Sequence, residues 1–185
     1  MKKSLFLALA AIGLSLTSCE KEEIGGTATM PLSGEWICTS YYSDTVSADV
    51  INWKFFYGYS EVYTFNTAEN IPSEMWINDE GFWFTQCKVN CSVDDMTFGS
   101  KDSIFDDVIY GTRAKIWGGK ITPGGAIAPG SGSKVDKIEY YAQFEDDIAG
   151  GGPFSTTYYL VGYRRTGFES DENTEKTDWE LPEQH

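Results

Sequence analysis

The chain has 185 residues and a formal net charge of −14 at pH 7, and 15% of its residues are aromatic. The acidity excludes nucleic acid and anionic lipid headgroups as favoured partners, because both would be repelled. The aromatic content suffices for one domain with a sizeable core, and it excludes an intrinsically disordered chain.

Residues 1–18 have the features of a cleaved export signal. Lys2 and Lys3 form a positive start, and residues 5–16 are an apolar run too short to span a bilayer comfortably. Small residues precede Cys19, as in bacterial lipoprotein signals, so we expect the mature chain to begin at Cys19 and to carry acyl chains there. The alternative is an ordinary secretory signal in which Cys19 is incidental.

Residues 19–32 are expected to form the lipidated cysteine and a flexible tether. Residues 20–23 are Glu-Lys-Glu-Glu, and Gly, Thr, Ala and Pro dominate residues 24–32. This acidic start resembles the signal that sends some Gram-negative lipoproteins to the outer face of the outer membrane. We therefore expect a lipid-anchored outer-membrane protein with surface display, the alternative being a solvated linker.

Residues 33–168 are predicted to form one all-β domain, followed by an acidic tail over 169–185 that packs little apart from Trp179. Segments rich in aromatic and β-branched residues predict strands at 36–42, 53–57, 61–65, 74–77, 82–89, 96–98, 108–112, 114–117, 135–144 and 155–165. A long Gly/Pro-rich loop is predicted over 118–133. About eight to ten short strands indicate a single antiparallel barrel or sandwich.

Alternation is clearest in the segment 135–144. Its predicted inner face carries Ile138, Tyr140, Ala142 and Phe144, while lysine, glutamate, tyrosine and glutamine occupy the other face. This segment is therefore expected to present one apolar and one wet surface.

Gly34 and Trp36 open the first predicted strand, and Arg164 and Arg165 close the last. In a closed barrel these two strands are neighbours, so Trp36 can lie beneath a guanidinium and close one end. Such a cation–π contact is worth about 0.5–2 kcal/mol. The alternative is that Trp36 is ordinary core and both arginines are solvated.

Three sequence blocks resemble a known family. Gly-Glu-Trp at 34–36, the segment 67–79 and the segment 159–169 are similar to bacterial lipoproteins described as lipid-binding putative hydrolases, with a calycin-like fold. The similarity covers roughly residues 32 to 172. It implies a calycin- or lipocalin-like β-barrel and a lipid ligand, and it supplies no catalytic residues.

Five aromatic residues are candidates for lining a cavity that accepts an acyl chain or another small hydrophobic molecule. These are Trp53, Trp76, Trp83, Tyr140 and Phe144. Two alternatives stay open: the rings fill a small barrel, or exposed rings form a platform for sugars on a glycan-binding surface lipoprotein. We expect no cofactor and no metal, and a membrane contact through the lipid anchor alone.

A hydrolase that uses carboxylates is the rival from another functional class. The chain has one histidine, His185 at its end, and no Gly-x-Ser-x-Gly elbow, which disfavours nucleophilic catalysis. Acidic pairs occur at 94–95, 106–107 and 146–147, but adjacent residues of a strand point to opposite faces. These pairs are therefore expected to be loop acids, and incidental calcium binding by loop oxygens is a further alternative.

Cys38, Cys87 and Cys91 are expected to be small buried apolar residues. Cys87 and Cys91 are too far apart to form a disulfide if the strand between them is extended.

Overall fold

The computed structural model describes residues 25–182, except for residues 48–49, 149 and 173. The expected signal, residues 1–18, and the expected lipidation site Cys19 lie outside the described residues. No helix in the described part of the chain is long and apolar enough to cross a membrane. The elements are η1 (Met30–Leu32), β1 (Gly34–Ser47), β2 (Val50–Asn66), β3 (Glu74–Asp79), β4 (Gln86–Ser92), β5 (Thr97–Phe98), β6 (Phe105–Asp106), β7 (Arg113–Ile127), β8 (Lys134–Phe144) and β9 (Tyr158–Arg164).

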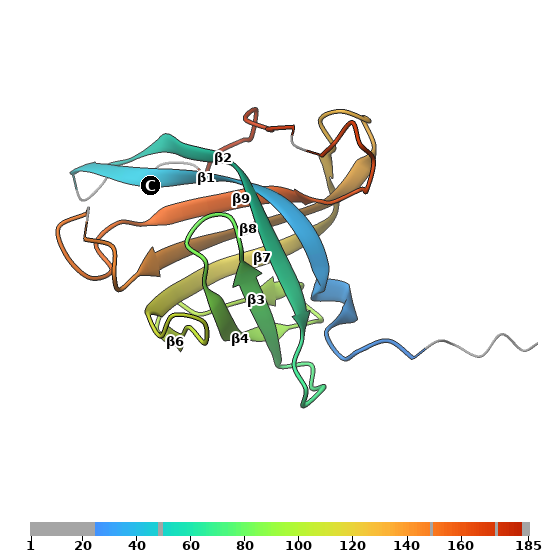
Figure 1. The fold of residues 1–185 in the computed structure, drawn as a ribbon, viewed down its shortest axis with the longest axis horizontal. Coiled ribbons are helices and arrows are strands. Elements are labelled where there is room, and N and C mark those ends of the chain that lie inside the picture. Colours follow the sequence, from blue (N-terminus) through green and yellow to red (C-terminus); the bar gives the residue numbers. More distant parts are fainter. Residues whose placement is uncertain (1–24, 48–49, 149, 173, 183–185) are drawn as a thin grey trace, which may run out of the picture.

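Antiparallel pairing closes these strands into a ring (Figure 1). The order β5-β4-β3-β2-β1-β9-β8-β7-β6 is closed by a further pairing between β5 and β7, so β6 lies beside β7 outside the ring. The first and last strands are neighbours, and Trp36 of β1 pairs with Arg164 of β9. The nine strands of the described residues confirm the prediction of an all-β, single antiparallel barrel.

Alternation along the strands decides which side chains fill this ring. In β8 the burial alternates as predicted. The inner cluster, with no member more than 4% exposed, comprises Leu32, Trp36, Cys38, Val62, Met75, Ile77, Cys87, Val89, Phe98, Ala114, Ile116, Ile121, Ile138, Tyr140, Ala142, Phe144, Tyr158 and Leu160. This part of the interior is therefore packed with side chains.

The predicted loop over 118–133 is wrong for residues 118–127, which continue strand β7. Two irregularities let the strand absorb its glycines: the register with β8 shifts between Trp117 and Lys120, and again between Thr122 and Ala126. The Gly/Pro composition therefore marks bulges of a long strand, and the chain turns only after Ile127.

One predicted strand is a loop for half of its length and another for all of it. The strand expected over 82–89 begins only at Gln86, and residues 108–112 turn between β6 and β7. In each case an aspartate just before the loop, Asp79 or Asp107, accepts hydrogen bonds from the loop's backbone N–H groups. Such local bonds compete with the ladder of a sheet.

The C-terminal segment packs against the outside of the barrel, so the expectation of a tail that packs little is wrong for residues 169–182. The Thr39 hydroxyl of β1 donates to the carbonyl of Lys176 at 2.6 Å, and the Trp179 indole N–H lies 3.4 Å from the Thr39 oxygen. Trp179 also joins the two apolar clusters on the outer faces of β1 and β9.

Candidate functional site

The two ends of the barrel are built differently. The closed end, where β1 begins and β9 ends, contains Leu32, Trp36, Thr64 and Arg164. The mouth, where β3 turns into β4 and β8 into β9, contains Tyr42, Phe56, Phe82, Trp83, Phe144 and Tyr158.

At the closed end, a guanidinium covers a buried indole. The Arg164 carbon Cζ lies 4.6 Å from the centroid of the Trp36 ring. The Trp36 Nε1–H donates to Thr64 Oγ1 at 2.9 Å, and the Thr64 hydroxyl donates to the Leu32 carbonyl at 2.6 Å. The indole is thus tied through a strand hydroxyl to η1.

Arg164 is held in place from two further sides. Its Nη1 donates to the carbonyl of Ser33 at 2.8 Å, and its Nε donates to Asp136 at 3.0 Å. A Cβ at Gly34 would lie 2.7 Å from the Arg164 Nη1, so only glycine leaves room for the guanidinium there. Of the four predicted closure residues, Gly34, Trp36 and Arg164 meet at this end.

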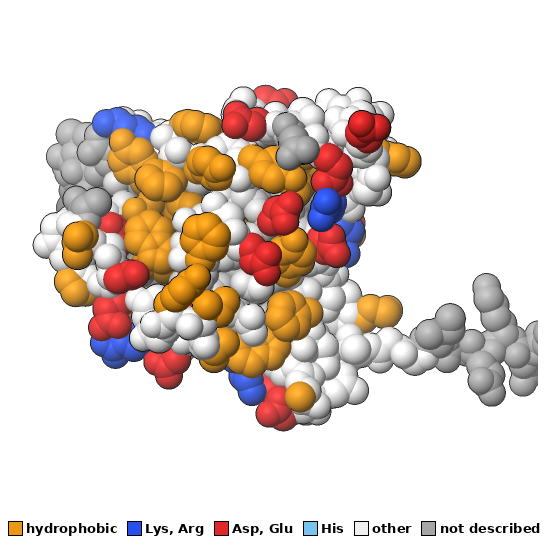
Figure 2. Space-filling model, in the orientation of Figure 1, with side chains coloured by type: hydrophobic (Ala, Val, Ile, Leu, Met, Phe, Trp, Pro, Cys, Tyr) orange, Lys and Arg blue, Asp and Glu red, His pale blue; other side chains and the backbone are white. Residues whose placement is uncertain are grey.

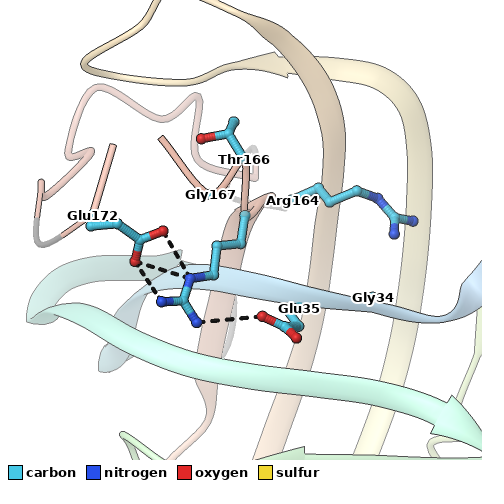
Figure 3. Close-up of a pocket in the computed structure, with 7 residues that line it drawn as sticks. Gly34, Glu35, Arg164, Thr166, Gly167 and Glu172 are labelled. Carbon is cyan, nitrogen blue, oxygen red and sulfur yellow. Dashed lines mark hydrogen bonds and ion pairs between the residues drawn. The ribbon is translucent and has the colours of Figure 1, made fainter. Parts of the chain in front are cut away.

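Arg165 has a different role, on a surface pocket of about 600 Å³ beside the closed end (Figure 3). Its guanidinium donates to both carboxylate oxygens of Glu172 at 2.9 Å and to Glu35 at 3.3 Å. Arg164 extends away from these acids in Figure 3. Because one cation holds both carboxylates, this pocket does not offer the free acid–base pair that a glycosidase needs.

The mouth is filled by stacked and edge-on aromatic rings. Trp83 stacks on Phe144 with a centroid separation of 4.5 Å and an interplanar angle of 5°. Phe82 contacts Phe56, Tyr158 and Phe144 at centroid separations of 5.5, 5.0 and 5.8 Å. Both Phe82 and Trp83 are only half-buried and belong to the loop between β3 and β4, so we call them the plug.

A buried carboxylate holds the plug. Asp79 Oδ1 accepts the backbone N–H of Gly81 at 3.1 Å and of Phe82 at 2.7 Å, and Oδ2 accepts that of Trp83 at 2.7 Å. Burial raises the pKa of Asp79 to about 6, although these three N–H donors favour the charged form. A strongly perturbed acid beneath a half-buried aromatic loop marks a candidate functional site.

The loop is strained and its surroundings are apolar. Phe84, which follows the plug, has a φ of 60° and is 54% exposed, a conformation that is unfavourable for an aromatic residue. Other exposed apolar side chains belong to the neighbouring loops, among them Tyr110 at 74% and Ile148 at 86%. Figure 2 shows hydrophobic side chains gathered over the β3–β4 loop and the strands beside it.

The structure brings two of the five ligand candidates together at the mouth, namely Trp83 and Phe144. Tyr140 lies deeper in the barrel, against Phe98. Trp53 packs on the outer face with Tyr159, and Trp76 lies on the outer face of β3 beneath Lys88.

Sequence reasoning missed Phe56, Phe82, Tyr158 and Asp79 as members of the site. The one available signal was Asp79 followed by Gly81, since an aspartate that bonds the next N–H groups begins a turn. That turn moves the plug residues out of the strand and across the mouth.

The acidic pairs of the loops act as hydrogen-bond acceptors. Asp146 accepts the Trp83 Nε1–H at 2.8 Å, and Asp147 accepts the Tyr158 hydroxyl at 3.1 Å. Asp95 accepts a hydroxyl from Ser92, and Asp107 accepts three backbone N–H groups. His185 lies outside the described residues, and within them no three His, Cys, Asp or Glu residues form a group that could hold a metal.

The three described cysteines are free thiols, with Cys38 and Cys87 buried and Cys91 half-buried. Burial raises the pKa of each; for Cys87 the pKa rises to about 12, with Asp107 adding to the shift. Thiols of this kind are poor nucleophiles.

A comparison with models of protein families matches residues 21–169 to the family described as lipid-binding putative hydrolase. The match spans well over half of the chain. A search of the curated proteins finds no match.

Proposed function

Since this chain belongs to the lipid-binding putative hydrolase family, we propose that it binds the hydrocarbon chain of a lipid at the mouth of the barrel. The observation that carries the proposal is the plug: two half-buried aromatic rings on a strained loop that close an apolar mouth. Rings that are stacked but incompletely buried can be displaced at modest cost and replaced by ligand.

Binding requires the plug to move, because the described interior below it is packed. When Phe82 and Trp83 withdraw, a hydrocarbon chain takes their place against Phe144 and Tyr158. Burying roughly 200 Å² of such a chain at about 25 cal/mol/Å² would contribute about 5 kcal/mol, from which the cost of opening is subtracted. The ligand therefore lies across the mouth and not along the barrel axis.

Charge at the mouth selects the headgroup. Asp79, Asp146 and Asp147 all face the plug or its neighbour Tyr158, whereas Arg164 and Arg165 belong to the opposite end. A fatty-acid carboxylate would be repelled by these acids. We therefore expect an uncharged lipid, such as a monoacylglycerol, to bind more tightly than a fatty acid at neutral pH.

The test uses the full chain with Cys19→Ser, so that no acyl group is attached. Titration with a pyrene-labelled monoacylglycerol and with cis-parinaric acid reports binding by fluorescence. We expect saturable binding of the first probe, tightened severalfold by Trp83→Ala, because this variant lacks the ring that the ligand must displace.

Trp76→Ala is the matched control, since it removes the same side chain from the outer face of the adjacent strand. It should leave the affinity unchanged. Absence of saturable binding for both probes, or an affinity of Trp83→Ala no tighter than that of Trp76→Ala, would overturn the proposal.

We further propose that the protein is an outer-membrane lipoprotein anchored through Cys19. The support is the sequence of residues 1–23: a short apolar signal, small residues before the cysteine and acidic residues after it. Expression in a Gram-negative host with radiolabelled palmitate should label the wild-type chain in the outer-membrane fraction. Cys19→Ala should abolish the label, and a labelled Cys19→Ala chain would exclude this anchor.

A further inference from the structure

A second aromatic surface lies on the outside of the barrel, away from the mouth. Trp117 of β7 stacks on Tyr141 of β8 at 5.6 Å with an interplanar angle of 18°, and Tyr141 lies 5.3 Å from Tyr159 of β9. Trp53 of β2 contacts both tyrosines, at 6.0 and 5.6 Å. Rings from four strands thus form one outer strip, which the lipid proposal does not use.

The C-terminal segment turns part of this strip into a pocket of about 350 Å³. Tyr141 and Tyr159 line it from the sheet, and Glu180 and Leu181 line it from the C-terminal segment. This volume is near the lower end of the roughly 300–1,000 Å³ typical of small-molecule sites.

Gly118 leaves room for the ring of Tyr141 at the pocket. It sits at the first irregularity of β7 with a φ of 61°, and a Cβ there would lie 2.9 Å from Tyr141 Cδ2. Any larger residue would be strained and would press on the ring. The irregularity that the sequence pattern predicted as a loop therefore shapes this pocket.

Polar groups of both signs surround the aromatic floor. Glu139 accepts hydrogen bonds from the Tyr159 hydroxyl and from Lys137 Nζ, each at 2.8 Å, so its carboxylate is fixed. Lys120 and Glu180 add a donor and an acceptor at the edge. Beside the pocket, the buried Trp53 indole N–H has no hydrogen-bond partner among the described residues, which is costly for a donor.

We infer that this outer pocket binds a saccharide. A sugar ring presents an apolar C–H face that can lie on Tyr141, and hydroxyls around its edge that both donate and accept hydrogen bonds. The fixed Glu139 and the nearby lysines suit such hydroxyls, whereas a hydrocarbon chain would cover these charged groups without offering them a hydrogen bond. The net charge of −14 favours a neutral saccharide over an acidic one.

The test is isothermal titration of the full Cys19→Ser chain with cellohexaose, maltohexaose, xylohexaose, mannohexaose and chitohexaose. We expect saturable binding of at least one neutral hexasaccharide. Tyr141→Ala should weaken it at least tenfold and Lys120→Ala severalfold, while Tyr141→Phe, which keeps the floor, should bind nearly as well as the wild type.

Trp83→Ala separates this proposal from the lipid proposal, because it alters the mouth and leaves the outer pocket intact. It should retain full saccharide binding. Failure of all five saccharides to bind, or equal affinity in folded Tyr141→Ala and wild type, would overturn the inference whatever the lipid titration shows. Circular dichroism of each variant establishes that it is folded.

Discussion

Asp171 at the closed end and Asp79 at the mouth are the same residue type, each almost fully buried, at 2% and 4% exposure. Both accept at least three hydrogen bonds. Their pKa values nevertheless shift in opposite directions. For Asp171, burial is outweighed by bonds from Thr166, Ser131 and Gly130, and the pKa falls; for Asp79, burial dominates and the pKa rises to about 6.

The two buried carboxylates indicate different roles for the two ends of the barrel. At the closed end, hydroxyl and backbone donors compensate the buried charge, so the charged form stabilises the fold. At the mouth, the charge of Asp79 is undercompensated at neutral pH, and the loop it holds also contains the strained Phe84. Such costs are typical of sites that change conformation or bind a ligand.

Removal of the indole at the closed end should destabilise the fold most. Trp36→Ala would leave a cavity beneath Arg164 and remove the N–H donor to Thr64 Oγ1. We expect a loss of about 3–5 kcal/mol in the free energy of unfolding, as for other buried tryptophans. Trp83→Ala, at the half-buried plug, should lose no more than about 2 kcal/mol by urea denaturation. Equal losses would remove the distinction between the two ends.

Acidification should stabilise the mouth. The folded pKa of Asp79 is about 6 and its unfolded pKa is near 3.9, so the folded state takes up this proton first as the pH falls. The contribution of Asp79 to stability therefore rises as the pH falls through 6 and is complete below about pH 4, a gain of at most about 3 kcal/mol. Asp79→Asn imitates the protonated form.

Urea denaturation at several pH values between 7 and 4 measures this effect. Asp79→Asn should be more stable than the wild type at neutral pH, and the two should converge as the pH approaches about 4. A constant difference across this range would mean that Asp79 does not titrate there.

Asp171→Asn should show the opposite sign. The lowered pKa means that the carboxylate stabilises the fold above its unfolded pKa, and that this contribution is lost as the pH falls through the folded pKa. We expect a loss of about 2 kcal/mol at neutral pH, because a charged acceptor of several bonds becomes neutral. The difference in the free energy of unfolding between variant and wild type should begin to shrink below about pH 4. If this difference instead grows as the pH falls, the pKa of Asp171 is not lowered in the folded state.

Much of the fold was predictable from local pattern. The alternation of residues 135–144 predicted the inner face of β8, and the positions of Trp36 and Arg164 at the two ends of the domain anticipated neighbouring first and last strands. The course of residues 118–127 was not predictable, because glycine is equally compatible with a loop and with a bulge. Only pairing with β8 decides between them.

The site was harder to predict than the fold. Trp83 and Phe144 are 61 positions apart in the chain and meet only because β3 and β8 end, and β4 begins, at the same side of the barrel. Trp53 and Trp76, like Trp83, belong to segments rich in aromatic residues, but their side chains lie on the outer face of the barrel. Whether a tryptophan points into or out of the barrel depends on the register of its strand, and a one-residue shift in register reverses that direction.

The hydrogen bond between the plug residue Trp83 and Asp146 can be removed by itself, and its loss should change stability least. Trp83→Phe keeps an aromatic ring on Phe144 but loses the Nε1–H bond to Asp146, a bond that solvent can reach. The free energy of unfolding should fall by about 0.5–1 kcal/mol, because an exposed hydrogen bond contributes little. The affinity for the monoacylglycerol probe should stay the same or increase, because a plug held by one hydrogen bond fewer opens more easily. If Trp83→Phe instead weakens lipid binding, the indole contacts the ligand directly and does not act as a displaceable plug.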